Sequence, residues 1–295
     1  MTPRALLIVN PGSRQGHQGS EEARALLSGA GLELVPESSE PASKPGDLIR
    51  RFRDQIDRVV VAGGDGTLNA VVQDLVGTGI PLGVLPLGTA NNLARTLGIP
   101  TGLPEACDVV VRGARRKIDL GWVNDRYFFT TASIGLSVAI TEALTSQTKR
   151  RWGPLAYGVA AARALTRSRL FRADISWPGG TRCSRTVQIV VGNGRYYGSA
   201  LPVAADAAID DARLDLYSLE VRRWLELLAL VPALRRGRHG EKESVEALRA
   251  TEFTITTVVS REINVDGEIC SHTPARFRVL PAALEVFAPN QRPAR

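Results

Sequence analysis

Up to Asp119 the chain alternates short apolar runs with amphipathic stretches. The apolar runs are rich in valine and lack a period of two, which is typical of parallel strands buried on both faces. We expect strands at Ala5–Val9, Leu32–Val35, Arg58–Ala62 and Leu82–Leu85, and helices at Glu21–Leu27, Asp47–Gln55, Thr67–Leu75 and Ala90–Leu97. This order predicts βαβ units that build a doubly wound, mostly parallel α/β domain.

After Asp119 the pattern changes to strands, many with alternating polar and apolar positions, which favours an antiparallel sheet. We expect these strands at Tyr127–Thr131, Ala173–Trp177, Thr186–Val191, Leu214–Leu219, Glu252–Val258, Ile263–Val265, Arg276–Val279 and Leu284–Phe287. Helices are expected at Leu155–Arg167 and Arg222–Arg235. The chain therefore divides into an α/β domain at 1–124 and a β-rich domain at 125–295. The last strand could pair with the sheet of the first domain.

Composition narrows the class of protein. The formal net charge is +7, but no arm or helix collects the basic residues, and aromatic residues make up only 5% of the chain, so we do not expect a nucleic-acid binder. Three cysteines and three histidines lie far apart, without the spacing of a zinc site, which favours free thiols in a reducing cytosol. The apolar run at the N-terminus is too short for a secretory signal, and Leu225–Leu234 is too short to span a bilayer.

The most informative motif is Gly63-Gly64-Asp65-Gly66-Thr67-Leu68-Asn69, which follows a strand and opens a helix. Glycines allow a ligand to approach the backbone, and a helix N-terminus offers free N–H groups to a phosphate. An ordinary tight turn is the alternative. The motif is neither a P-loop nor a dinucleotide fingerprint, because no lysine is near and Asn69 replaces the third glycine. Asp65 repels phosphates unless a cation bridges them or the carboxylate orients a donor, which indicates Mg²⁺ with a nucleoside triphosphate.

Two further polar loops follow predicted strands. In Pro86-Leu87-Gly88-Thr89-Ala90-Asn91-Asn92, the threonine and the asparagines could bind ligand oxygens or only cap the next helix. Asn10-Pro11-Gly12-Ser13-Arg14 follows the first strand. Since the carboxyl ends of parallel strands share one edge of the sheet, three such loops favour a nucleotide site there.

These motifs resemble the catalytic family of the diacylglycerol kinases, which includes bacterial lipid kinases, sphingosine kinases and ceramide kinases. The resemblance covers nearly the whole chain. Beyond the three loops already described, it rests on Ile118-Asp119-Leu120-Gly121, Val191-Gly192-Asn193-Gly194-Arg195-Tyr196-Tyr197-Gly198 and Val265-Asp266-Gly267-Glu268. The first glycine loop is also shared by NAD kinases and phosphofructokinases. The second loop and the late Asp-Gly-Glu are more specific.

The resemblance implies a kinase that binds ATP on the first domain and phosphorylates a lipid hydroxyl in a cleft between the domains. It implies Asn10, Gly63–Asn69 and Thr89 as the nucleotide site, Asp266 as general base, and Glu268 close to it. A carboxylate that accepts the proton of an aligned hydroxyl suits phosphoryl transfer. Without the resemblance, Asp266-Gly267 is interpreted as the turn of a β-hairpin.

The resemblance also implies a structural Mg²⁺ held by the carboxylate of Asp211 and the main-chain carbonyls of Ala208 and Arg213. The sequence departs from the family here, because Ala212 stands where glycine is usual. If that position needs a positive φ, an alanine is strained there. A solvated acidic turn without a metal is the alternative.

The sequence leaves several alternatives open. The acceptor could be diacylglycerol or another lipid alcohol, or a soluble molecule as in an NAD-kinase-like enzyme, and a nucleotide sensor without catalysis is a third hypothesis. We expect a cytoplasmic protein, peripheral to the inner membrane face, with Lys149–Arg151 and Arg163–Arg172 as candidate lipid contacts. The oligomeric state is not determined by the sequence.

Overall fold

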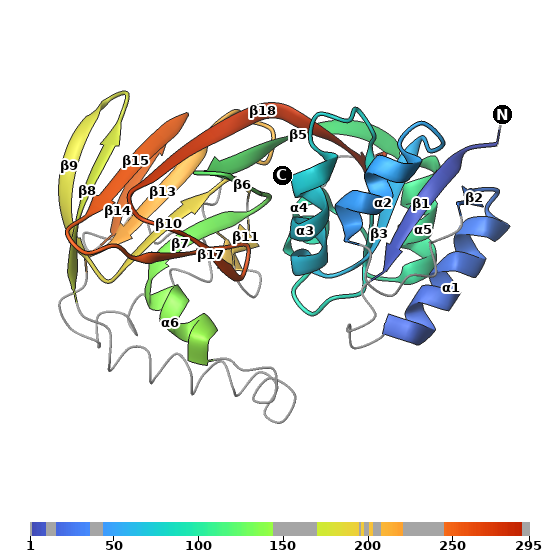
Figure 1. Ribbon diagram of the computed structural model, residues 1–295, viewed down its shortest axis with the longest axis horizontal. Helices are drawn as coiled ribbons and strands as arrows, with labels where there is room; N and C mark the ends of the chain where they lie inside the picture. The colour runs from blue at the N-terminus through green and yellow to red at the C-terminus, as the bar shows by residue number, and fades with distance from the viewer. Residues whose placement is uncertain are drawn as a thin grey trace. The chain divides into compact units, whose positions relative to one another are not determined.

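The computed structural model describes residues 2–9, 16–35, 44–143, 170–194, 196–197, 201–202, 208–220 and 245–290. Asn10 and the expected helices Leu155–Arg167 and Arg222–Arg235 lie outside the described residues. Contacts divide the chain into two compact units, each described by itself (Figure 1). The first unit contains the chain up to Leu120 and from Pro281 to the end, and the second contains most of the intervening residues.

The first unit is built on a parallel sheet of strand order β2-β1-β3-β4, with the C-terminal part of β18 beside β4. Every residue of β3 and β4 is buried, as expected for strands covered on both faces. The strands are β1 (Arg4–Val9), β2 (Glu33–Leu34), β3 (Arg58–Gly63), β4 (Leu82–Pro86), β5 (Ala114–Val123) and β18 (Ala275–Ala288).

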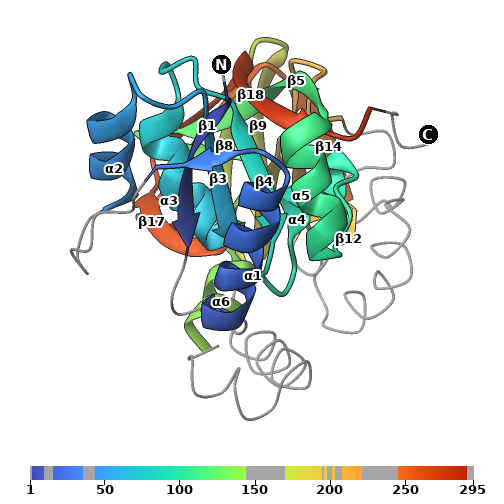
Figure 2. The ribbon, with the colours of Figure 1, turned by 90° about the vertical axis from the view of Figure 1, so that its right-hand side faces the viewer.

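Helices cover both faces of this sheet. In Figure 2, α2 and α3 lie on one side of the strands and α1 and α5 on the other, in agreement with the contacts within each pair. The helices are α1 (Gly16–Gly29), α2 (Pro45–Phe52), α3 (Asp65–Leu75), α4 (Asn92–Leu97) and α5 (Leu103–Arg112). The prediction missed α5, which packs against α1 and β4.

The strand order creates a switch point in this sheet. The connection from β1 leads outward to β2, and the chain then returns to place β3 on the other side of β1. In doubly wound sheets, ligands bind at the carboxyl ends of the strands where the order reverses. Here the carboxyl end of β3 leads into Gly63-Gly64.

The second unit contains two larger sheets and the two-stranded sheet β11-β12. One of the larger sheets has the strand order β14-β13-β10-β7-β16-β17, and in the other β15 pairs with the N-terminal part of β18 and with β8, which pairs with β9. The elements of this unit that have not yet been given bounds are β6 (Arg126–Phe128), β7 (Thr131–Gly135), α6 (Leu136–Ala143), β8 (Phe171–Trp177), β9 (Gly180–Thr186), β10 (Gln188–Gly192), β11 (Tyr196–Tyr197), β12 (Leu201–Pro202), β13 (Leu214–Leu219), β14 (Val245–Ala250), β15 (Glu252–Thr257), β16 (Glu262–Val265) and β17 (Glu268–His272).

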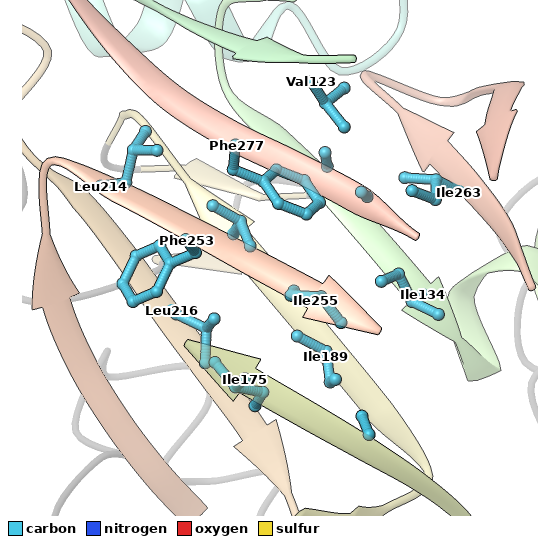
Figure 3. Close-up of a cluster of buried hydrophobic side chains, with 14 of the residues drawn as sticks. Val123, Ile134, Ile175, Ile189, Leu214, Leu216, Phe253, Ile255, Ile263 and Phe277 are labelled. Carbon is cyan, nitrogen blue, oxygen red and sulfur yellow. The ribbon is translucent and has the colours of Figure 1, made fainter. Parts of the chain in front are cut away.

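A hydrophobic cluster with side chains from both larger sheets forms the core of the second unit (Figure 3). Phe253 and Ile255 of β15 and Phe277 of β18 belong to it together with Ile134 and Ile189 from the other sheet. All five side chains are 1% exposed or less. Burial of this apolar surface is the main favourable term for the unit.

The structure confirms the α/β fold class, with a parallel N-terminal sheet and an antiparallel C-terminal part, and corrects some strand bounds. The strand expected at Tyr127–Thr131 is interrupted, because Phe129 and Thr130 lie between β6 and β7 and donate their N–H groups to Asp266. The two last expected strands are one strand, β18. It bends at Ala282, whose φ is +51°, where the carboxylate of Asp119 accepts the Ala282 N–H at 2.8 Å.

We expect Phe277→Ala to lower the free energy of unfolding by about 3–5 kcal/mol, because it leaves a cavity in the core of the second unit. Arg276→Ala is the matched control on the same strand: its exposed side chain pairs with Glu252, and such a pair contributes less than about 1 kcal/mol. Urea unfolding measures both values. Equal losses in the two variants would contradict this description of the core.

Candidate functional site

The first glycine loop places a helix N-terminus at the switch point of the parallel sheet. Gly64 is the N-cap of α3, and no side chain caps the helix there in the described structure. The N–H groups of Thr67 and Leu68 bond to the carbonyl of Gly64, so those of Asp65 and Gly66 precede the first intrahelical bond. Such amides, together with the positive end of the helix dipole, suit a phosphate group.

The two glycine loops touch each other through their backbones. A Cβ atom added to Gly88 would lie 2.4 Å from the Cα of Gly64, and one added to Gly64 would lie 3.1 Å from the Cα of Gly88. A Cβ on Gly63 would meet the hydroxyl of Thr67 at 2.8 Å. Packing between the loops therefore explains these glycines without a ligand, and the same packing holds the two loops in one place.

Asp65 lies between the two loops and binds the start of α4. Its carboxylate accepts the N–H of Leu93 at 3.3 Å and the side-chain amide of Asn92 at 3.4 Å. A carboxylate at a helix N-terminus is stabilised by the amides and by the helix dipole. Asp65 thus caps α4 from a distant part of the chain, a role that the sequence did not predict.

Asn91 of the second loop holds the loop itself together. Asn91 has φ +49°, accepts the N–H of Gly88 at 3.0 Å, and donates to the carbonyls of Pro86 and Gly88. Thr89, predicted to bind nucleotide, is exposed beside this network. In the first loop, Leu68 and Asn69 are buried, and the Asn69 side chain accepts a bond from Gln73.

In the second unit, Asp266 and Gly267 form the two-residue turn between β16 and β17. Both have positive φ, +47° and +100°, which is the signature of a type I′ hairpin turn. The hairpin interpretation of Asp-Gly is therefore confirmed. Glu268 is the first residue of β17 and is exposed.

The Asp266 side chain, however, turns inward and accepts four hydrogen bonds. Oδ1 accepts the N–H groups of Thr130 (3.1 Å) and Thr131 (3.0 Å) and the Thr130 hydroxyl (2.6 Å). Oδ2 accepts the N–H of Phe129 at 2.7 Å. Desolvation by burial raises the pKa of Asp266 above its ordinary value of 3.8, and the four hydrogen bonds, with that of the Thr130 hydroxyl first, oppose the rise.

Asn193 holds the segment that binds Asp266. Its side-chain amide donates to the carbonyl of Phe129 at 3.0 Å, and its N–H donates to the carbonyl of Thr130 at 2.8 Å. Asn193 is 3% exposed. Sequence reasoning assigned no role to Asn193 or to Phe129–Thr131. The only available signal was the position of Asn193 in a family motif, because backbone amides leave no trace in the sequence.

The loop before β13 contains the residues predicted to hold Mg²⁺. Ala212 has φ +57°, so the alanine adopts the left-handed conformation that glycine would adopt more easily. The carboxylate of Asp211 accepts the N–H of Arg213 at 3.0 Å, which closes a tight turn. A carboxylate and main-chain carbonyls are hard oxygen donors of the kind that Mg²⁺ binds, so these residues fit the ion.

The described residues contain neither a cluster of metal-binding side chains nor a helix that could span a membrane. No group of three or more histidine, cysteine, aspartate or glutamate side chains there could hold a metal ion. Within the same residues, no helix has the length and apolar character needed to cross a bilayer.

Comparisons with known proteins match both units. Residues 4–123 match the family model of the diacylglycerol kinase catalytic domain, and residues 130–288 match that of the YegS C-terminal NAD kinase beta sandwich-like domain. Proteins named diacylglycerol kinase from Staphylococcus aureus strains JH9 and bovine RF122 / ET3-1 are 31% and 30% identical in alignments of 298 positions that cover 98% of this chain and 94% of each relative.

Solved structures agree on the fold. A diacylglycerol kinase from Bacillus anthracis str. Sterne matches with a TM-score of 0.79 at 22% identity, over 97% of each chain. A second structure from that organism gives 0.77 at 23% identity, also over 97% of each chain. The protein is a phosphotransferase with an alcohol group as acceptor. It belongs to the diacylglycerol kinase family of lipid kinases.

Gly88→Ala tests the contact between the glycine loops. The new Cβ would force the loops apart, and overpacking of this kind costs about 1–3 kcal/mol. We expect a lower free energy of unfolding and weaker binding of an ATP analogue, measured by urea unfolding and calorimetry. Gly29→Ala is the control, because nothing lies within 4 Å of its added Cβ. Unchanged values for Gly88→Ala would contradict the contact.

Thr130→Val removes the hydroxyl donor to Asp266 and keeps the side-chain shape. We expect the pKa of Asp266 to rise further, because the hydroxyl opposes the rise. A hydrogen bond to a charged group contributes about 1.5–3 kcal/mol. The loss of stability should therefore be full at pH values above the folded pKa of Asp266 and should shrink as the pH falls through it, since the carboxyl is then neutral in both proteins.

Unfolding curves over a pH series measure this dependence. Thr254→Val, on the exposed face of β15, is the control and should change little at any pH. A loss of equal size at every pH would mean that the Thr130 hydroxyl does not bind the ionised carboxylate.

Proposed function

We propose that the protein transfers the γ-phosphate of ATP to the hydroxyl of a lipid alcohol, with Asp266 as the general base. The observation that carries this proposal is the held carboxylate of Asp266: four donors fix it, and its pKa is raised. A raised pKa makes a carboxylate a better proton acceptor near neutral pH, and a fixed position aligns it with an acceptor hydroxyl.

The hydrogen bonds distinguish the two oxygens of Asp266. Within the described part of the chain, Oδ1 accepts three donors and Oδ2 accepts one, the N–H of Phe129. We therefore assign proton acceptance to Oδ2, which keeps a lone pair for the substrate hydroxyl. Glu268 follows the same turn and remains the second candidate base.

The nucleotide is assigned to the first unit. The amides at the N-terminus of α3 would hold phosphate oxygens, with Gly63–Asn69, Thr89 and Asn10 as the contacting residues, although Asn10 lies outside the described part of the chain. Asp211, with the carbonyls of Ala208 and Arg213, would hold a structural Mg²⁺. A divalent cation with the nucleotide would supply charge neutralisation of the phosphates.

Diacylglycerol is the acceptor that the names of the relatives suggest, and a related lipid alcohol remains open. One observation favours a second candidate function, phosphorylation of a soluble acceptor: the family model of the second unit is named after the β-sandwich of NAD kinases. For the lipid reaction we propose a cytoplasmic protein that associates peripherally with the inner membrane face.

Incubation with labelled ATP and Mg²⁺ separates the two candidates. One series of reactions contains a lipid extract or diacylglycerol in detergent, and the other contains NAD or sugars. Label in the organic phase, identified by mass, supports the lipid kinase. Label only in NAD or a sugar would replace it with the soluble alternative.

We expect Asp266→Asn to lower kcat by about 10²–10⁴-fold while nucleotide affinity is retained, because general-base catalysis contributes a factor of that size. The melting temperature must be measured as well, since the new amide faces N–H donors. Glu268→Gln changes the same turn at an exposed position and should reduce kcat less. Near-normal turnover of folded Asp266→Asn would remove Asp266 from the reaction, and a loss confined to Glu268→Gln would transfer the role to Glu268.

A further inference from the structure

Exposed apolar side chains gather at one end of the β9-β8-β15 sheet. Among the described residues, the large hydrophobic side chains classed as exposed are Leu170 (37%), Val258 (86%) and Val259 (71%). The two valines form the turn after β15, and Leu170 directly precedes β8. These strands lie side by side in Figure 1.

The register explains why residues so distant in sequence share one end of the sheet. Thr257 of β15 is paired with Ala173 of β8, and the strands are antiparallel. β15 ends at Thr257, so Val258 and Val259 follow the strand at the same end of the sheet where Leu170 precedes β8. We call Leu170, Val258 and Val259, with the turn that carries the valines, the apolar tip.

Hydrogen bonds hold the turn, although its two valines are exposed and do not pack into a core. The hydroxyl of Ser260 donates to the carbonyl of Thr273 at 2.7 Å, and the N–H of Arg261 donates to the Thr273 hydroxyl at 2.9 Å. The Thr257 hydroxyl donates to the carbonyl of Val259 at 2.8 Å. A flexible turn could fold its valines back, but this one presents them outward in a fixed conformation.

Basic side chains lie at the same end of the sheet as the apolar tip. Arg172 and Arg185 are exposed and directly opposite each other on β8 and β9. The guanidinium of Arg261 lies 4.1 Å from the centroid of the Phe171 ring. Among the described residues, the acidic groups at this end are Asp174, which lies 3.7 Å from Arg172, and the exposed Glu262. Three arginines against two carboxylates leave a basic rim, in a chain of net charge +7.

We propose that the apolar tip inserts into the interface of an anionic lipid bilayer, with Arg172, Arg185 and Arg261 at the level of the headgroups. Apolar side chains with arginines at the same end of the sheet fit a surface that is negatively charged outside and apolar beneath. A second copy of this chain fits less well, because three side chains on a protruding turn are far fewer than the roughly 20–30 residues a side of a stable interface.

This proposal rests on the proposed function, because membrane binding by the apolar tip would bring the protein to an acceptor that lies in the membrane. β16 begins immediately after Arg261 and ends at the Asp266 turn, so the apolar tip and the candidate base are at opposite ends of one strand. Four residues span about 13 Å. If β16 is perpendicular to the bilayer, the lipid hydroxyl at Asp266 would lie about 13 Å above the apolar tip.

Vesicle flotation of the full chain tests the proposal without nucleotide or acceptor. The vesicles contain either equal parts of phosphatidylglycerol and phosphatidylcholine or phosphatidylcholine alone. We expect the protein to float with the anionic vesicles, and the double variant Val258→Ser, Val259→Ser to bind about tenfold more weakly, because apolar burial is lost. Val258→Phe should bind more tightly. Melting temperatures should stay unchanged, since the serines remove none of the bonds that hold the turn.

The basic rim has a matched control. Arg185→Gln should weaken binding to the anionic vesicles, whereas Arg276→Gln, at an exposed arginine that pairs with Glu252, should not. The proposal fails if the parent protein does not float, or if the double serine variant binds as the parent does. Light scattering gives a further outcome. If the double serine variant is a monomer where the parent is a dimer, and flotation is unchanged, the proposal fails and the apolar tip is instead a contact with a second copy.

A kinase assay with a short-chain diacylglycerol in solution separates this proposal from the proposed function. The double serine variant should phosphorylate the dispersed acceptor at the rate of the parent and should be slower only on acceptor in vesicles. Normal flotation without any lipid phosphorylation would contradict the proposed function and leave membrane binding in place. Phosphorylation of the dispersed acceptor without flotation would contradict membrane binding by the apolar tip and leave the proposed function in place.

Discussion

The enclosed carboxylate of Asp266 is the constraint on which the second unit depends. A buried charge is costly unless hydrogen bonds replace its water, and here four donors do so. Three of these are main-chain N–H groups of Phe129–Thr131, so this segment leaves the regular strand between β6 and β7. Asn193 then holds the segment from the other side. The hairpin turn, the strand interruption and the buried asparagine are therefore parts of one arrangement.

In the first unit, backbone contact between the two glycine loops is the main constraint on the site. Gly64 and Gly88 pack so closely that a Cβ on Gly88 would clash with the Cα of Gly64, and Asp65 joins the first loop to the start of α4. The loops are therefore positioned before any ligand binds. Preorganised N–H donors are favourable for phosphate chemistry, because the protein need not reorganise when charge develops. The glycines thus serve packing and ligand approach together.

The two interpretations of Asp266-Gly267 show how far local reasoning extends. Asp-Gly predicts a type I′ turn, and the positive φ of both residues confirms it. A turn residue normally directs its side chain to solvent, yet Asp266 directs its carboxylate to amides more than a hundred residues earlier in the chain. Tyr127–Thr131 was wrong as a single strand for the same reason: its residues have strand propensity, and a distant carboxylate overrides that propensity.

The sequence by itself determined the alternation of strands and helices, the glycine loops after the strands, the hairpin turn and the family, because these depend on neighbouring residues and on motifs. Tertiary structure alone decided which amides meet Asp266, that Asp65 caps α4, that the Ala282 N–H meets Asp119, and that Leu170 and Val258 lie at the same end of one sheet. Each of these features joins residues far apart in the chain. They depend on strand register and loop packing, which no local pattern of side chains specifies.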